Sequence, residues 1–235
     1  MSFPSDVHND GAYSKKPGEV MTGTTIMAAS FDGGVILGAD SRTSTGNYVA
    51  NRATDKITQL SGNIWICRSG SAADTQNISM YVQAMLDQHQ MEAGRAATIQ
   101  LAANLVRNIA YENKEMLQAG MIVAGWDSVR GGQVYGVPLG GTLLRVPYTI
   151  GGSGSAYITG WCDKRWRDGM SRGECREFVI RAVAHAMARD GSSGGCIRLV
   201  TVTKDGPEKE FIPGEHVPVV GQGDMAPPNG KPVLV

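Results

Sequence analysis

The order in which strand-like and helix-like segments follow one another constrains the fold of this chain more than any other feature. Runs of β-branched and apolar residues bounded by Gly- and Asp-rich turns indicate strands, and apolar residues every three or four positions indicate amphipathic helices. Strands are expected at residues 24–31, 35–40, 57–60, 64–68, 121–126, 134–138, 143–146, 197–202 and 210–212. Helices are expected from residue 72 onward, with Ile78, Val82, Met85 and Leu86 on one face, and around residues 99–110 and 175–186. Strands and helices therefore come in blocks.

This block order predicts the fold class. Blocks of strands separated by helices favour packed sheets with helices on their outer faces over alternating βαβ units. Hydrophobic residues make up 42% of the 235 residues, so the chain can bury a core of that kind. We expect a single α+β domain followed by an extended, proline-rich arm at residues 214–235, which needs something to hold it.

Charge and cysteine usage exclude several classes of protein. The 22 basic residues balance the 22 acidic ones, so the chain lacks the broad basic field of a nonspecific nucleic-acid-binding protein. The four cysteines are far apart and form no CxxC pair, which indicates a reducing, intracellular compartment and no bound metal. Residues 1–20 lack the apolar core of a secretory signal, and residues 146–162 are too polar for a membrane helix. The partners are expected to be proteins or small molecules.

The familiar short motifs of catalysis and nucleotide binding are weak in this sequence. Gly152-Ser153-Gly154 begins like a dinucleotide-binding loop, but Tyr157 stands where the third glycine would be. The GxSxG elbow of a serine hydrolase is missing, and each histidine stands alone. No cofactor is expected.

Five short blocks form an ordered set that carries more information than any one of them. Taken singly, a threonine at a strand start is favoured by β-propensity, and an Asp or Lys at a strand end is usually solvated. The blocks are Thr22 to Ala28, Gly38 to Arg42 with Asp55-Lys56, Arg68 to Asp74, Gly152 to Ser155, and Asp190 to Gly195. Together they resemble the catalytic beta subunits of the proteasome core, which are N-terminal-nucleophile hydrolases, from about Thr22 to at least Val202.

The resemblance implies a four-layer αββα sandwich and a self-cleavage site between Gly23 and Thr24. Residues 1–23 would be a propeptide, residues 24–213 the hydrolase domain, and Thr24 a nucleophile whose hydroxyl is activated by its own α-amine. Such an amine has a pKa of about 7.7 to 8.0, close to working pH. Lys56 would be a buried cation held by Asp40, and Gly70 would donate an N–H to the oxyanion. Ser153, Asp190 and Ser193 would complete the network around the amine, although the residues alone are equally consistent with turns that cap helices.

The resemblance also implies a substrate preference. The residue before Ser69-Gly70 lies at the base of the specificity pocket in this family, and here it is Arg68, which would favour cleavage after Glu or Asp through charge-assisted hydrogen bonds. Without the resemblance, Arg68 would be a surface arginine that ends a strand. The other pocket positions are small or polar, as in the caspase-like class, whose immune counterpart has an apolar residue at the arginine position. By similarity these positions are Thr43, Thr54, Thr58, Ala72 and Gln76, with Ser44 in the substrate-aligning stretch where Thr is usual.

The family implies partners and alternatives as well. The expected partners are other beta and alpha subunits in a four-ring, 28-subunit barrel, regulatory caps and unfolded polypeptide substrates, in the cytoplasm and nucleus. A structural beta subunit without activity is the alternative, but such subunits usually lack the Gly-Thr junction or the Asp and Lys partners. A bacterial-type ATP-dependent protease subunit is disfavoured by the length, the propeptide and the proline-rich arm.

Overall fold

A computed structural model describes residues 23–46 and 48–220. The strands are β1 (Ile26–Phe31), β2 (Gly34–Asp40), β3 (Thr43–Thr45), β4 (Tyr48–Asn51), β5 (Ile57–Ser61), β6 (Ile64–Gly70), β7 (Ala119–Asp127), β8 (Gly131–Val137), β9 (Leu144–Arg145), β10 (Tyr148–Gly151), β11 (Ile197–Thr203) and β12 (Gly206–Ile212). The helices are α1 (Ala72–Ala93), α2 (Ile99–Glu112), α3 (Ser155–Arg165), α4 (Arg172–Arg189) and the short 3₁₀ turn η1 (Gly214–His216).

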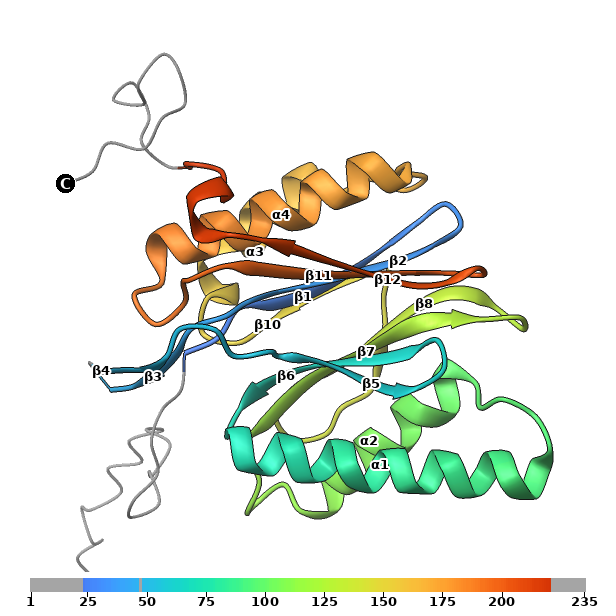
Figure 1. Cartoon of the computed structure of the whole chain (residues 1–235). Helices are drawn as coiled ribbons and strands as arrows, with labels where there is room; N and C mark the ends of the chain where they lie inside the picture. The colour runs from blue at the N-terminus through green and yellow to red at the C-terminus, as the bar shows by residue number, and fades with distance from the viewer. Residues whose placement is uncertain (1–22, 47, 221–235) are drawn as a thin grey trace, which may run out of the picture.

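The strands form two five-stranded antiparallel sheets that lie face to face. One sheet has the order β10-β1-β2-β11-β12 and the other β5-β6-β7-β8-β9, while β3 and β4 form a separate two-stranded ribbon. Helices α3 and α4 cover the first sheet, and α1 and α2 cover the second, so the molecule has four layers (Figure 1). The expected α+β, αββα sandwich is confirmed.

Alternating side chains of the strands build the separate cores between these layers. In β1, Met27 and Ala29 face α4, whereas Ile26 and Ala28 face the other sheet. Successive side chains of a strand point to opposite faces, so a strand between two layers must be apolar on both. The sequence of β1 is apolar on both faces for this reason.

The expected helices are present, with one difference in the face of α1. Ile78, Val82 and Leu86 are buried against β5 and β6, but Met85 at the edge of that face is 45% exposed. In α4, Ser171 and Glu174 form a reciprocal capping box that satisfies backbone N–H groups at the start of the helix.

Five elements were not predicted from the sequence, and one of them, the turn η1, lies at the start of the stretch that was expected to be extended. The ribbon β3–β4 is made largely of polar residues, and β10 is only half-buried. Helix α3 buries only Ile158 and Cys162, which leaves no apolar stripe for a periodicity argument to find. These elements are specified by their neighbours more than by their own pattern.

The two ends of the chain lie largely outside the described residues. Of the expected propeptide only Gly23 is described, and of the expected arm only residues 214–220. Within the part of the chain that the structure describes, no helix is both long enough and apolar enough to span a bilayer.

Candidate active site

Thr24 lies immediately before β1, in a tight junction with the loop that precedes α3. Its side chain is buried, with 4% exposed, and its carbonyl oxygen accepts a hydrogen bond of 3.1 Å from the N–H of Gly154. Gly152 has a φ of +81°, and a Cβ there would lie 2.1 Å from that same oxygen. Only glycine permits this close approach of the two backbones.

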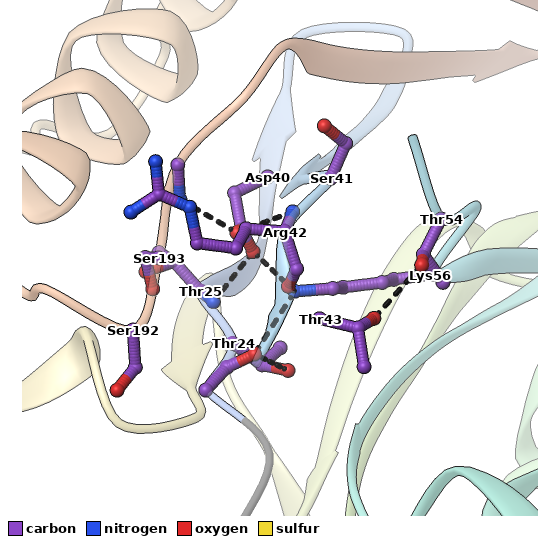
Figure 2. Close-up of polar contacts among 12 residues, drawn as sticks. Thr24, Thr25, Asp40, Ser41, Arg42, Thr43, Thr54, Lys56, Ser192 and Ser193 are labelled. Carbon is purple, nitrogen blue, oxygen red and sulfur yellow. Dashed lines mark hydrogen bonds and ion pairs between the residues drawn. The ribbon is translucent and has the colours of Figure 1, made fainter. Parts of the chain in front are cut away.

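Asp40 and Lys56 form a buried ion pair beside Thr24 (Figure 2). Lys56 Nζ donates to Asp40 Oδ1 at 2.7 Å, to the carbonyl oxygen of Arg42 at 2.6 Å and to that of Gly23 at 3.2 Å. All three ammonium donors therefore have acceptors. Burial lowers the pKa of Lys56 below its ordinary value of 10.5, while the Asp40 carboxylate acts in the opposite direction.

The Asp40 carboxylate also organises the backbone around the site. Its Oδ1 accepts from the N–H of Thr25 at 2.8 Å, and its Oδ2 accepts from the N–H groups of Arg42 at 3.1 Å and Gly194 at 3.0 Å. The pairing of Asp40 with Ile197 between β2 and β11 brings the Gly194 loop within reach. A single buried carboxylate thus ties three segments together.

A second polar chain reaches Thr24 from the other side. The N–H of Thr24 donates to Ser153 Oγ at 3.1 Å, and Ser153 Oγ donates to Asp190 Oδ2 at 2.7 Å. Ser193 Oγ donates to the same Asp190 oxygen at 2.6 Å and lies 2.8 Å from Thr25 Oγ1. Ser153, Asp190 and Ser193 are therefore together, connected to the Thr24 nitrogen through Ser153.

Gly70 ends β6 next to Thr24, and both line the same small pocket. Its φ is +98°, and a Cβ there would lie 2.1 Å from the carbonyl oxygen of Gln118. Alternation along β6 turns Arg68 toward the pocket, while Ser69 Oγ donates to the carbonyl oxygen of Gly120 on β7.

Most of the expected substrate-binding residues line this pocket. The lining comprises Thr24, Thr43, Thr54, Asp55, Lys56, Arg68, Gly70, Ala72, Thr75 and Gln76. Thr58 does not contribute to the lining, since it lies farther along β5 opposite Ile66. Ser44 does not line it either, because its side chain is directed to Gly23. Asp55 and Thr75 were not predicted to line it, although Asp55 directly precedes Lys56.

Arg68 supplies a positive charge to the pocket. The side chain is half-buried, and its Nη2 donates to the backbone carbonyl of Asp55 at 3.0 Å. Its Nε is buried and has no hydrogen-bond partner among the described residues. Burial lowers the pKa of Arg68 below its ordinary value, and the nearby Asp55 carboxylate opposes this shift. A guanidinium with spare donors suits an incoming carboxylate.

The bond between Gly23 and Thr24 lies at the centre of these contacts. Thr24 Oγ1 donates to the carbonyl oxygen of Gly23 at 2.7 Å, and Lys56 Nζ reaches the same oxygen. A Cβ at Gly23 would lie 1.9 Å from Ser192 Cβ, so no other residue fits there. The hydroxyl of Thr24 is thus next to the carbonyl group of the residue before it.

The site also contains residues that the sequence did not single out. These groups are Thr25, Ser192 and the Arg42 carbonyl. All three belong to the five sequence blocks described above, but their contacts depend on the tertiary structure. Among residues 23–46 and 48–220, no group of three His, Cys, Asp or Glu side chains is arranged to hold a metal ion.

Comparison with known proteins gives consistent matches over most of the chain. Residues 20–202 match the model of the proteasome subunit family. Proteasome subunit beta type-6 of Arabidopsis thaliana is 54% identical over 83% of this chain and 84% of its own length. Proteasome subunit beta type-1 of Saccharomyces cerevisiae is 50% identical over 86% and 94%, and human beta type-9 is 50% identical over 86% and 92%.

The four-layer sandwich is the fold of the N-terminal-nucleophile hydrolases, and a buried threonine precedes its first strand. Within that class, the chain belongs to the proteasome subunit family, as a beta subunit of the core particle. The names of its relatives agree with the expected beta type-1 class. Members of this family work as assemblies, so the chain is one component of a larger particle.

Proposed function

We propose that this beta subunit is a threonine-type endopeptidase that releases its own N-terminus and then cuts unfolded polypeptides after acidic residues. The observation that carries the proposal is the position of Thr24 Oγ1, 2.7 Å from the Gly23 carbonyl oxygen and beside the buried Lys56–Asp40 pair. A hydroxyl needs activation to act as a nucleophile, and a nearby cation stabilises the negative charge that develops on attack.

The first reaction is self-cleavage. Thr24 Oγ loses its proton and bonds to the Gly23 carbonyl carbon, the bond from that carbon to the Thr24 nitrogen breaks, and the nitrogen takes up a proton. Water then hydrolyses the resulting ester, which leaves a carboxylate on Gly23 and restores the Thr24 hydroxyl. Lys56 stabilises the developing charge, since its ammonium is 3.2 Å from the Gly23 oxygen.

The same groups serve peptide hydrolysis once the α-amine of Thr24 is free. That amine takes the proton from Thr24 Oγ as general base, because its ordinary pKa of about 7.7 to 8.0 lies near working pH. Ser153 lies 3.1 Å from the nitrogen and, with Asp190 and Ser193, orients it. The precursor cannot use this base, because its nitrogen is part of an amide.

The substrate is bound on the other side of Thr24. In this proposal the N–H of Gly70 donates a hydrogen bond to the oxyanion. Because Gly70 has no Cβ, the substrate backbone can lie against the end of β6. Arg68 is assigned to the carboxylate of an acidic side chain in the pocket, where its buried Nε supports the assignment. Lys and Arg side chains would meet like charge there.

The remaining parts of the proposal concern the assembly. Residues 1–23 act as a propeptide, residues 24–213 form the hydrolase domain, and residues 214–235 reach neighbouring subunits. The particle is a four-ring, 28-subunit barrel of alpha and beta subunits with regulatory caps, in the cytoplasm and nucleus. A purely structural beta subunit would not need Thr24, Lys56 and Asp40 in this arrangement.

The test compares Thr24→Ala with Thr24→Ser in assembled particles. Thr24→Ala chains should keep residues 1–23 by intact mass and should not hydrolyse a fluorogenic peptide that ends in Glu. Thr24→Ser keeps a hydroxyl and should still mature and cleave, more slowly. If the wild-type chain keeps residues 1–23, or if Thr24→Ala matures normally, the subunit is not a self-processing threonine protease.

A further inference from the structure

The side chain of Ser44 contacts the residue that self-cleavage would release. The backbone N–H of Gly23 donates to Ser44 Oγ at 3.2 Å, and the Ser44 side chain is buried, with 4% exposed. Thr43, the residue before it on β3, is bonded instead to Thr54, with 2.8 Å between the two Oγ1 atoms. Ser44 thus faces Gly23 while Thr43 lines the pocket, on the two sides of a register irregularity between these residues in β3.

The Ser44 contact is one of several that hold the bond before Thr24. The Gly23 carbonyl accepts from Thr24 Oγ1 and Lys56 Nζ, and the N–H of Thr24 donates to Ser153. Ser192 packs where a Cβ of Gly23 would be. Ser44 adds a hydrogen bond to the N–H of Gly23, at the end of this residue away from Thr24. Hydrogen bonds therefore hold the peptide groups on both sides of Gly23.

A glycine at this position needs such a contact. Glycine has more backbone freedom than any other residue type. Rotation about φ and ψ of Gly23 would turn its carbonyl away from Thr24 Oγ1 and Lys56. A hydrogen bond to its own N–H limits that rotation. Reacting groups that are already held in contact react fast, because the entropy of bringing them together has been lost beforehand. Small displacements of these groups lower the rate by large factors.

We infer that the Ser44 hydroxyl is a positioning residue for self-cleavage, which holds the Gly23 amide so that its carbonyl faces Thr24 Oγ1 and Lys56. This inference rests on the proposed function and adds a residue to it. Ser44 acts through Gly23 and touches none of the atoms whose bonds change. Gly23 leaves with the propeptide, so this hydroxyl contact belongs to the precursor alone. It is distinct from any pairing of the β3 backbone with substrate.

The experiment compares Ser44→Val with Ser44→Thr, which have nearly the same shape and differ in the hydroxyl acceptor. Each full-length variant is co-expressed with its partner subunits and pulse-labelled, and the half-time for appearance of a chain that begins at Thr24 is followed by intact mass. Ser44→Thr should mature at close to the wild-type rate, whereas Ser44→Val should be slower by about tenfold or more. Ser44→Ala should resemble Ser44→Val.

A second version of each variant keeps the result independent of folding. In it, Thr24 is exposed by an added processing protease, so that assembly does not depend on self-cleavage. Ser44→Val should then enter particles to the same extent as Ser44→Thr. If Ser44→Val fails to assemble in this form, its side chain has a general structural role and the inference is overturned.

The remaining outcomes separate this inference from the proposed function. Equal maturation rates for Ser44→Val and Ser44→Thr, with Thr24→Ala still uncleaved, would overturn the role of Ser44 and leave Thr24 as the nucleophile. Maturation of Thr24→Ala would overturn both. A rate deficit in Ser44→Val and Ser44→Ala that Ser44→Thr restores is the expected result.

Discussion

Lys56 Nζ lies 2.7 Å from Asp40 Oδ1, and both side chains are almost completely buried at the point where β1, β2 and β5 approach Thr24. A buried ammonium without a counter-charge would tend to lose its proton. Asp40 therefore favours the charged form of Lys56 beside Thr24, and removing either side chain would leave the other buried without a counter-charge.

Asp40→Asn should be strongly destabilising. The neutral amide of the new side chain cannot balance the charge of Lys56. Its NH₂ group would also stand where a carboxylate oxygen now accepts hydrogen bonds. The free energy of unfolding should therefore fall by about 3–5 kcal/mol. Thermal denaturation measures this change, and intact mass should show that residues 1–23 are retained. Glu208→Gln is the control, because its ion pair with Arg172 is exposed and should matter little. Equal effects of the two substitutions would contradict the importance of burial.

Gly70→Ala should remove most of the peptidase activity. The backbone at φ +98° strains any other residue, and the new Cβ would meet the Gln118 carbonyl at 2.1 Å, which displaces the N–H assigned to the oxyanion. Loss of one such donor lowers kcat by about 10² to 10³. Gly160→Ala in α3 is a matched control, since nothing lies within 4 Å of its added Cβ and alanine favours a helix. A Gly70→Ala enzyme with wild-type kcat would exclude the oxyanion role.

Arg68→Leu should change which peptides are cut. Hydrolysis of a Glu-ending fluorogenic peptide should fall relative to that of a branched-chain apolar one by about 10- to 100-fold in kcat/KM, because a charge-assisted hydrogen bond contributes about 1.5–3 kcal/mol. Arg68→Lys keeps the charge but loses the planar fork and should lie between the two. An unchanged ratio of the two rates would remove Arg68 from the specificity pocket.

The activity of mature particles should depend on pH through two groups. It should rise as the Thr24 amine loses its proton, near its ordinary pKa of about 7.7 to 8.0. It should fall again as Lys56 deprotonates, and because burial lowers the pKa of this lysine, that fall should begin below its ordinary value of 10.5. Initial rates with a Glu-ending peptide test this, since its carboxylate stays ionised throughout. Activity that persists undiminished beyond pH 10.5 would argue against a required ammonium.

The sequence alone predicted much of the fold because the relevant patterns are local. The hairpin of β1 and β2, the apolar faces of α2 and α4, and the closing strands follow from periodicity and turn chemistry. Helix α3 and strand β10 were not predicted, because few of their side chains are buried. Without a clear row of apolar residues, the sequence shows no period to detect.

The candidate site divides in the same way. Thr24, Asp40, Lys56 and Gly70 could be selected because their short blocks match a known family. Two other features could not be predicted in this way: Thr58 does not line the pocket, and Ser44 contacts Gly23. Both depend on the direction in which a strand's side chains point.

The sequence by itself determined which residue types stand at each strand end and which faces are apolar. The tertiary structure decided that Ser153, 129 residues after Thr24, donates to Asp190 while accepting from the Thr24 nitrogen. It did so because β11 pairs with β2 and β10 pairs with β1, which brings the Asp190 and Ser153 loops to the same end of one sheet. Strand pairing is a long-range choice, set by how the two sheets bury their shared core, and no local pattern encodes it.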